Sequence, residues 1–324
     1  MAENESPAAT DRTGFVPVTG LLQATLSAVV NAAGRVAVAH RPAPRNDLPD
    51  PARGLEAIVR GLKAFFDDAL LENGRTVHPR VFLRLQELVG RELDAVRPLL
   101  AARIRRGLIR FHPGEDGLDW TVAASADVAA VAAGLTCAGR GDRAAEFVDE
   151  YIRASGDGEV RALLPFFTAW HGVASVLRDA ADVQQAKAAW LLALGRLEEP
   201  RRRPCLALLQ SPDDVSTDAT VQELETKAGL RAVRCCEALR QLGGGNPAAD
   251  RTPEWIDRAC HACLRQTEQL LFEGRRVLVI APFGDNGWQN RFAAIGTRWA
   301  VPVVTLDPTP GVALASLRSE GLHD

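Results

Sequence analysis

The stretch LALLQSPDDVSTDATVQELETKAG, residues 206–229, decides the fold class of the second half of this 324-residue chain. Its first four residues are apolar, as in a buried strand, and a short polar segment separates them from a helical pattern at 217–228. A strand, a polar loop and a helix in this order form one unit of an α/β sheet. The same order occurs where a loop holds phosphate groups, but the glycines and the lysine of such a loop are missing here.

Further apolar runs extend this pattern towards the end of the chain. After residue 204 the predicted strands are 205–210, 230–235, 276–281 and 301–306. The predicted helices between them are 217–228, 254–273 and 287–299. Alternating strands and helices predict a parallel sheet covered by helices, with right-handed crossovers. Strands that are apolar almost throughout are typical of a sheet buried on both faces. We therefore expect an α/β domain at 205–324.

The preceding part, 54–199, has a helical pattern instead. Apolar residues recur three and four positions apart in the predicted helices, at 58–70, 81–104, 126–138, 142–154, 159–180 and 187–197. Local contacts dominate such a pattern, so we expect a mostly helical domain that precedes the α/β domain. The overall fold class is then α/β.

Two proline-containing segments bound the helical part. Residues 1–53 are expected to be disordered or irregular, apart from one helix followed by a short strand within 16–40. Residues 198–205, EEPRRRPC, end the helical part because proline stops helices. We interpret the three consecutive arginines in this segment, Arg201 to Arg203, as a solvated linker rather than a basic patch.

The composition excludes several functional classes. A formal net charge of −3 predicts no general attraction to nucleic acid or to anionic membranes. The polar, acidic start is unlike a signal peptide, and no apolar stretch approaches the length of about 18 residues that a membrane span needs. Six cysteines without an export signal are expected to be reduced thiols. We therefore expect a cytoplasmic protein.

The polar loop after residue 210 carries acids and hydroxyls where a phosphate loop carries glycines and a lysine. In the G-x-x-x-x-G-K-[ST] frame, serines take both glycine positions, Thr217 takes the lysine position and Asp218 takes the position of the metal-binding hydroxyl. The residues of this vestigial phosphate loop are Ser211, Asp213, Asp214, Ser216, Thr217 and Asp218.

These acids oppose nucleotide binding. Like charges about 4 Å apart repel by about 4 kcal/mol at an effective dielectric constant near 20. A micromolar affinity corresponds to about 8 kcal/mol, so one such carboxylate would cancel much of it. We therefore interpret the segment as a helix start capped by its own side chains, with Thr220 and Glu223 as a capping box.

The α/β part resembles a known family. Residues 252–283 (TPEWIDRACHACLRQTEQLLFEGRRVLVIAPF), the pair at 291–292 and residues 301–318 (VPVVTLDPTPGVALASLR) carry this resemblance. On these segments, 205–318 is similar to the zeta-toxin-like P-loop kinase half of bacterial AAA-family ATPase fusion proteins, whose other half is aminoglycoside-phosphotransferase-like. Two acidic positions of the family fall on Cys236 and Ile280, whereas Arg291 is retained. The resemblance implies a truncated P-loop-kinase-like domain.

The helical part resembles the other half of those fusion proteins. LDAVRPLLAARIRRGLIR, residues 93–110, is similar to the helix before the catalytic loop of aminoglycoside phosphotransferases. Their HGDLHxxN loop appears here as HPGEDGL, residues 112–118, in which Gly114 matches, Glu115 takes the place of the catalytic Asp and the Asn is absent. The strand with the metal-binding Asp is expected to be deleted, because Trp120 and a helix follow at once.

The resemblance implies a kinase scaffold from which the chemistry has been lost. Phosphoryl transfer requires metal ligands, a cation on the phosphates and a positioned base, and neither half keeps that set. The expected function is that of a pseudokinase-like protein that needs no cofactor and binds or scaffolds a protein partner. The alternative is an active ATP-dependent small-molecule phosphotransferase with divergent residues, which would use Glu115 or the turn at 285–291.

Three other groups of residues are candidate sites. Cys260 and Cys263 suggest a zinc site, with Cys235 and Cys236 as further ligands, although buried thiols on a helix are the simpler interpretation. The turn after the third strand of the α/β part could hold a small polar ligand, because ligands bind beyond the carboxyl ends of parallel strands. Its polar residues are Asp285, Asn286, Gln289, Asn290 and Arg291, and a helix cap is the competing interpretation.

His112, Glu115 and Asp116 form the third group. They could act as an acid–base cluster. Carboxylates in a Gly/Pro-rich turn are more often simply exposed, so Glu115 is only a weak catalytic candidate.

Overall fold

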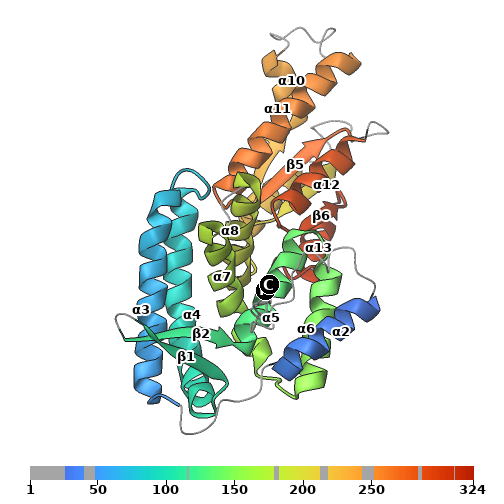
Figure 1. The fold of residues 1–324 in the computed structure, drawn as a ribbon. Helices are drawn as coiled ribbons and strands as arrows, with labels where there is room; N and C mark the ends of the chain where they lie inside the picture. The colour runs from blue at the N-terminus through green and yellow to red at the C-terminus, as the bar shows by residue number, and fades with distance from the viewer. Residues whose placement is uncertain are drawn as a thin grey trace, which may run out of the picture.

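The computed structural model describes residues 26–39, 48–114, 117–178, 182–211, 218–242, 252–283, 287–309 and 311–324. Within these ranges the fold is α/β, with twelve α-helices, a two-stranded hairpin and a parallel four-stranded sheet (Figure 1). The expected fold class is confirmed at this level. No helix in the described ranges is long and apolar enough to cross a membrane.

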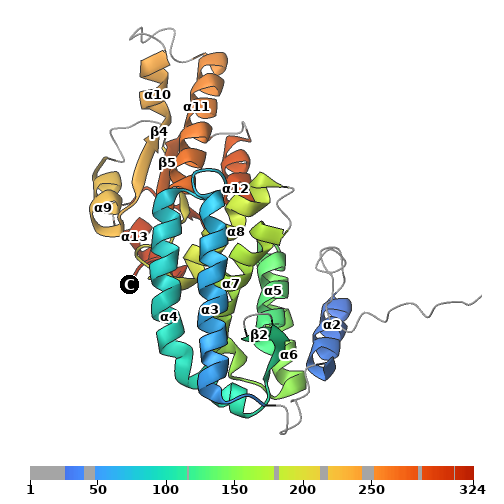
Figure 2. The ribbon, with the colours of Figure 1, turned by 60° about the vertical axis from the view of Figure 1, so that its left-hand side comes forward.

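Helices form nearly all of the first half. They are Leu26–Ala39 (α2), Pro51–Ala69 (α3), Pro79–Arg105 (α4), Ala124–Cys137 (α5), Gly141–Ser155 (α6), Val160–Arg178 (α7) and Val183–Leu197 (α8), with a 3-10 turn at Leu70–Glu72 (η2). The long helices α3 and α4 lie side by side, and α7 and α8 pack behind them (Figure 2). Their shared core contains the buried aromatic side chains of Phe82, Phe166 and Trp190.

Two details of this half differ from the expectations. Within 1–53, for which we expected mostly irregular structure, α2 remains helical to Ala39. It therefore replaces the short strand that we expected at its end. The reason is that Val29, Ala32 and Val36 recur at helical spacing and are buried in a core with α5 and α6.

The second difference is a hairpin where we expected a turn between helices. Strands Ile109–Gly114 (β1) and Gly117–Ala123 (β2) pair antiparallel, so a strand is present where we expected one to be deleted. Ile109 is buried and Phe111, two residues later, packs on the same core, which is the alternation of a strand.

An arginine at the end of α4 anchors the turn between α6 and α7. Arg103 is fully buried, and its guanidinium donates two hydrogen bonds of 2.6 and 2.7 Å to the carboxylate of Asp157 and one of 3.1 Å to Glu159. The turn follows Gly156, whose φ of 72° ends α6 in the left-handed conformation that glycine favours. The break between the helices predicted at 142–154 and 159–180 is therefore confirmed.

The second half contains the parallel sheet and its helices. The strands are Leu206–Gln210 (β3), Arg231–Arg234 (β4), Val277–Ala281 (β5) and Val303–Leu306 (β6), and the helices are Asp218–Ala228 (α9), Cys235–Leu242 (α10), Pro253–Phe272 (α11), Trp288–Arg298 (α12) and Val312–Ser319 (α13). The strand order is β4-β5-β3-β6, and all neighbours are parallel. All four strands lie where the apolar runs predict them.

Both faces of the sheet are covered. Leu224 of α9 and Leu317 of α13 share one core with alternate residues of β3 and β5, such as Leu209. The opposite face, with Leu208 of β3, joins the core of the helical half through side chains such as Phe292 of α12. This arrangement explains why the strands are almost continuously apolar.

Candidate functional site

The structure describes only the two ends of the predicted phosphate loop. Residues 212–217, with Asp213, Asp214, Ser216 and Thr217, lie outside the described ranges. Ser211 is buried, and its backbone N–H donates to the carbonyl of Ala281 at 3.1 Å. Asp218 begins α9 and accepts a 2.8 Å hydrogen bond from Arg234, at the end of β4. The chain therefore balances this carboxylate with its own cation.

The proposed capping box at the start of α9 is wrong. Thr220 lies inside the helix, and its hydroxyl donates to the carbonyl of Pro308 at 2.6 Å. Glu223 instead accepts from Lys227 at 2.9 Å and from the backbone N–H of Gly311 at 2.9 Å. The two side chains tie α9 to the segment between β6 and α13, because that segment lies beside the helix on the same face of the sheet.

The turn after β5 is described only from residue 287 onward, so Asp285 and Asn286 lie outside it. The guanidinium of Arg291 lies 4.5 Å from the ring centroid of Trp288, which is buried. Gln289 donates to the hydroxyl of Thr305 at 3.3 Å. Within the described residues, Arg291 packs on its own helix and Gln289 joins α12 to β6.

The cysteines form a buried cluster. Cys235, Cys260 and Cys263 are each 1% exposed, and the Sγ atoms of Cys235 and Cys260 are 3.6 Å apart. The Cys235 thiol donates towards the sulfurs of Cys260 and Cys263, and these contacts, together with burial, raise its pKa. Among the described residues, no group of three or more His, Cys, Asp or Glu side chains is placed to hold a metal ion. The geometry is that of free, buried thiols.

The hairpin tip that holds the weak catalytic candidate is also outside the described ranges. Glu115 and Asp116 fall between β1 and β2, and only the backbone of His112 is placed, opposite Asp119.

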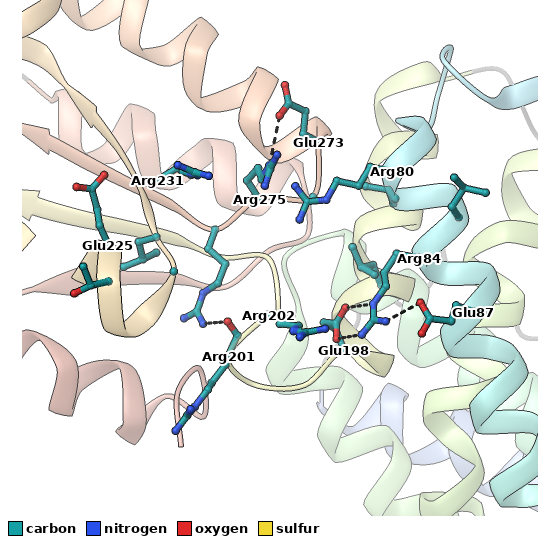
Figure 3. Close-up of a pocket in the computed structure, with 18 residues that line it drawn as sticks. Arg80, Arg84, Glu87, Glu198, Arg201, Arg202, Glu225, Arg231, Glu273 and Arg275 are labelled. Atoms are coloured by element: carbon teal, nitrogen blue, oxygen red, sulfur yellow. Dashed lines mark hydrogen bonds and ion pairs between the residues drawn. The ribbon is translucent and has the colours of Figure 1, made fainter. Parts of the chain in front are cut away.

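A cleft between the two halves is lined mostly by charged side chains, and the sequence analysis did not identify it. It has a volume of about 810 Å³ and lies at the amino ends of β4 and β5, opposite the edge where the phosphate loop was predicted (Figure 3). The charged side chains that line it are Arg80, Arg84, Glu87, Glu198, Arg201, Arg202, Glu225, Arg231, Glu273, Arg275 and Arg276. Seven arginines against four glutamates leave three positive charges.

Some of these arginines hold the walls of the cleft together. Arg84 donates two 2.7 Å hydrogen bonds to Glu198, which joins α4 to the end of α8 (Figure 3). Burial raises the pKa of Glu198, but the hydrogen bonds from Arg84 and from a backbone N–H outweigh burial and leave the pKa below its ordinary value. Arg276 is buried and donates to the carbonyls of Arg201 and Leu322.

Other arginines point into the cleft without such partners. Within the described ranges, no carboxylate lies within ion-pair distance of Arg80, Arg202 or Arg231. Arg275 contacts Glu273 only at 3.6 Å. Partial loss of water, followed by repulsion from Arg275 and Arg231, lowers the pKa of Arg80, and the attraction of Glu273 offsets part of this shift. The three guanidiniums come from separate elements and line the same cleft (Figure 3).

One sequence signal pointed to this cleft. Arg201 and Arg202 belong to the basic run that we interpreted as a solvated linker, and both line the cleft. The remaining arginines come from α4, β4 and the turn before β5, so no local pattern unites them.

Comparison with known proteins finds no protein-family model that matches the chain, no curated protein that is similar to it and no solved structure that it matches.

Proposed function

We propose that this chain is a non-catalytic binding protein on a degenerate kinase-like scaffold, and that it binds or scaffolds a protein partner. The segments that resemble kinases follow the order of strands and helices in that family, but other residues stand where the groups that phosphoryl transfer requires would be. Binding is the function that such a scaffold can keep without them.

The observation that carries this proposal is the ion pair between Asp218 and Arg234. The start of a helix is where backbone N–H groups and the helix dipole favour a phosphate. Here a carboxylate occupies the first position of α9, and its 2.8 Å contact with Arg234 already uses a nearby cation. A triphosphate at this position would meet the negative charge of Asp218 and compete with it for Arg234.

An ATP-turnover assay tests the catalytic half of the proposal. We expect purified chain with Mg²⁺ and ATP to release ADP no faster than buffer does, and Asp218→Asn to behave in the same way. ADP release that increases with the amount of chain, and that changes in the Asp218→Asn variant, would favour the alternative of an active phosphotransferase.

A cross-linked pull-down tests the binding half. The tagged chain serves as bait in a lysate of its native host, and the tag alone serves as the control. We expect one or a few proteins to be enriched over the control. Recovery of the same proteins in the same amounts with both baits would count against a protein partner.

A further inference from the structure

Some arginines of the cleft have no carboxylate within ion-pair distance in the described ranges. Arg84 and Arg276 are engaged with Glu198 and with backbone carbonyls, whereas Arg80 and Arg231 make no ion pair with any residue in the described ranges. Burial, and then repulsion from the guanidiniums of Arg275 and Arg231, lower the pKa of Arg80, and the attraction of Glu273 offsets part of this shift. An anion between them would remove that repulsion.

The three guanidiniums come from different parts of the fold. Arg80 lies in the first turn of α4, Arg231 is the first residue of β4 and Arg275 lies in the turn between α11 and β5. They therefore reach the cleft from the helical half and from the amino end of the sheet (Figure 3). A group held by all three must accept hydrogen bonds from several directions.

We propose that this cleft binds a small phosphate ester, with the phosphate held jointly by Arg80, Arg231 and Arg275. A phosphate group carries about −1.5 to −2 charges and three acceptor oxygens, which suits three surrounding guanidiniums. A carboxylate has two oxygens and is matched by one guanidinium fork. The proposal does not depend on the presence of a protein partner.

The electrostatic balance and the size of the cleft agree with such a ligand. The lining side chains carry three net positive charges. Residues at the carboxyl ends of α8, α9 and α11 and at the amino end of α4 also line the cleft. Each helix end contributes about half a charge, negative at a carboxyl end and positive at an amino end, so the total charge falls from +3 to about +2. One phosphate monoester neutralises that sum. A volume of about 810 Å³ lies in the range of small-molecule sites and leaves room for the rest of the ligand.

The apolar lining suggests where the uncharged part of the ligand lies. Val81, Leu83 and Leu194 line the side of the cleft formed by the helical half, beside the Arg84–Glu198 pair. Leu83 is 63% exposed although it is large and apolar. A ligand whose phosphate lies at Arg231 and Arg275 would extend its remaining atoms over these side chains.

Isothermal titration with pyrophosphate as the probe tests the proposal. Citrate at equal ionic strength serves as the carboxylate comparison. We expect pyrophosphate to bind the full chain, and Arg231→Ala and Arg80→Ala each to weaken that binding about tenfold or more, because each removes charge-assisted hydrogen bonds. Arg91→Ala is the matched control on the exposed side of α4, away from the cleft, and it should leave the affinity unchanged.

The outcomes separate clearly. Arg80 and Arg231 make no ion pair within the described residues, so both variants should melt within a few degrees of the parent. If Arg80→Ala does not fold, the affinity of Arg231→Ala decides the question. The proposal is refuted if no binding of pyrophosphate is detected at concentrations up to about 10 mM, because a site of millimolar affinity would be mostly occupied there. It is also refuted if citrate binds as tightly as pyrophosphate, or if Arg231→Ala binds as the parent does.

Discussion

Replacing Arg84 with alanine should destabilise the protein through the carboxylate that it leaves behind. Glu198 is 4% exposed in its side chain and Arg84 is 21% exposed, so neither partner is screened as a surface pair would be. The two 2.7 Å hydrogen bonds in a fork geometry are of the stronger, charge-assisted kind. After the substitution, Glu198 keeps only the backbone N–H of Glu199, at 3.2 Å.

The magnitude follows from this geometry. Breaking a buried ion pair by removing one partner costs about 3–5 kcal/mol, and hydrogen bonds to charged groups contribute about 1.5–3 kcal/mol. Arg84 is partly open to solvent, so we expect Arg84→Ala to lower the free energy of unfolding by about 2–3 kcal/mol at pH 7. Glu198→Gln should cost about 1 kcal/mol, since the amide oxygen still accepts from Arg84.

The pH dependence of this loss provides a second measurement. In the parent protein the pKa of Glu198 lies below its ordinary value, so the pair stabilises the fold above the unfolded pKa of about 4.3 and this stability is lost as the pH falls through the folded pKa. In Arg84→Ala burial still raises the pKa of Glu198, and only the backbone N–H of Glu199 and the charge of Arg202 oppose it. The difference between the two proteins should therefore be largest near pH 7 and should close below about pH 4.

Urea unfolding at pH 7 and pH 4 measures both effects. Arg97→Ala, which removes an exposed arginine paired with Asp94 on the same helix, is the control and should change the free energy of unfolding by less than about 0.5 kcal/mol. A loss below about 0.5 kcal/mol for Arg84→Ala at pH 7 would refute the reasoning, as would a loss that stays constant between the two pH values.

Three further predictions concern buried positions elsewhere in the fold. Arg103→Met should lower the free energy of unfolding by about 3–5 kcal/mol in urea titrations, since it leaves Asp157 without its main partner, and a loss under about 1 kcal/mol would contradict this role. Gly296→Ala should cost about 1–3 kcal/mol, because its Cβ would lie 1.9 Å from a methyl group of Val303; an unchanged melting temperature would show that α12 does not pack this closely on β6. The Cys260 thiol, 1% exposed, should react with a thiol reagent only as urea unfolds the chain, and rapid labelling in native buffer would disprove its burial.

The sequence predicts the elements that depend on local pattern. The run VLVIA at 277–281 is buried along its whole length, and such a run between helical segments specifies a central parallel strand. Helix α11 is predicted to within one residue at each end, because its apolar period continues for several turns and Pro253 stands at its first position.

Elements without such a pattern were missed. Helices α10 and α13 have eight residues each, too few for a helical period to stand out from a loop. In the hairpin of β1 and β2, the glycines and the proline of HPGEDG indicate a turn, and only the packing of Ile109 against the helical core identifies the preceding residues as a strand. Contacts between distant parts of the chain decide these elements.

The candidate cleft was missed for a related reason. A motif can be recognised when its residues lie together in the sequence, as in the vestigial loop around Asp218. Arg80 and Arg231 are 151 positions apart in the sequence, and only the fold brings both to the same cleft. The short run at Arg201 and Arg202 is the one local trace, and charge runs of that length are usually solvated.

The net charge of the chain also conceals the cleft. A value of −3 predicts no general attraction to polyanions, since that attraction depends on the whole molecule. A site responds to the charges within about one Debye length, which is about 8 Å at physiological salt. Among the side chains that line the cleft the arginines outnumber the glutamates by three, and the protein walls strengthen their field. An acidic protein can therefore hold a selective anion site, and raising the salt concentration should weaken pyrophosphate binding because the added ions screen these few charges.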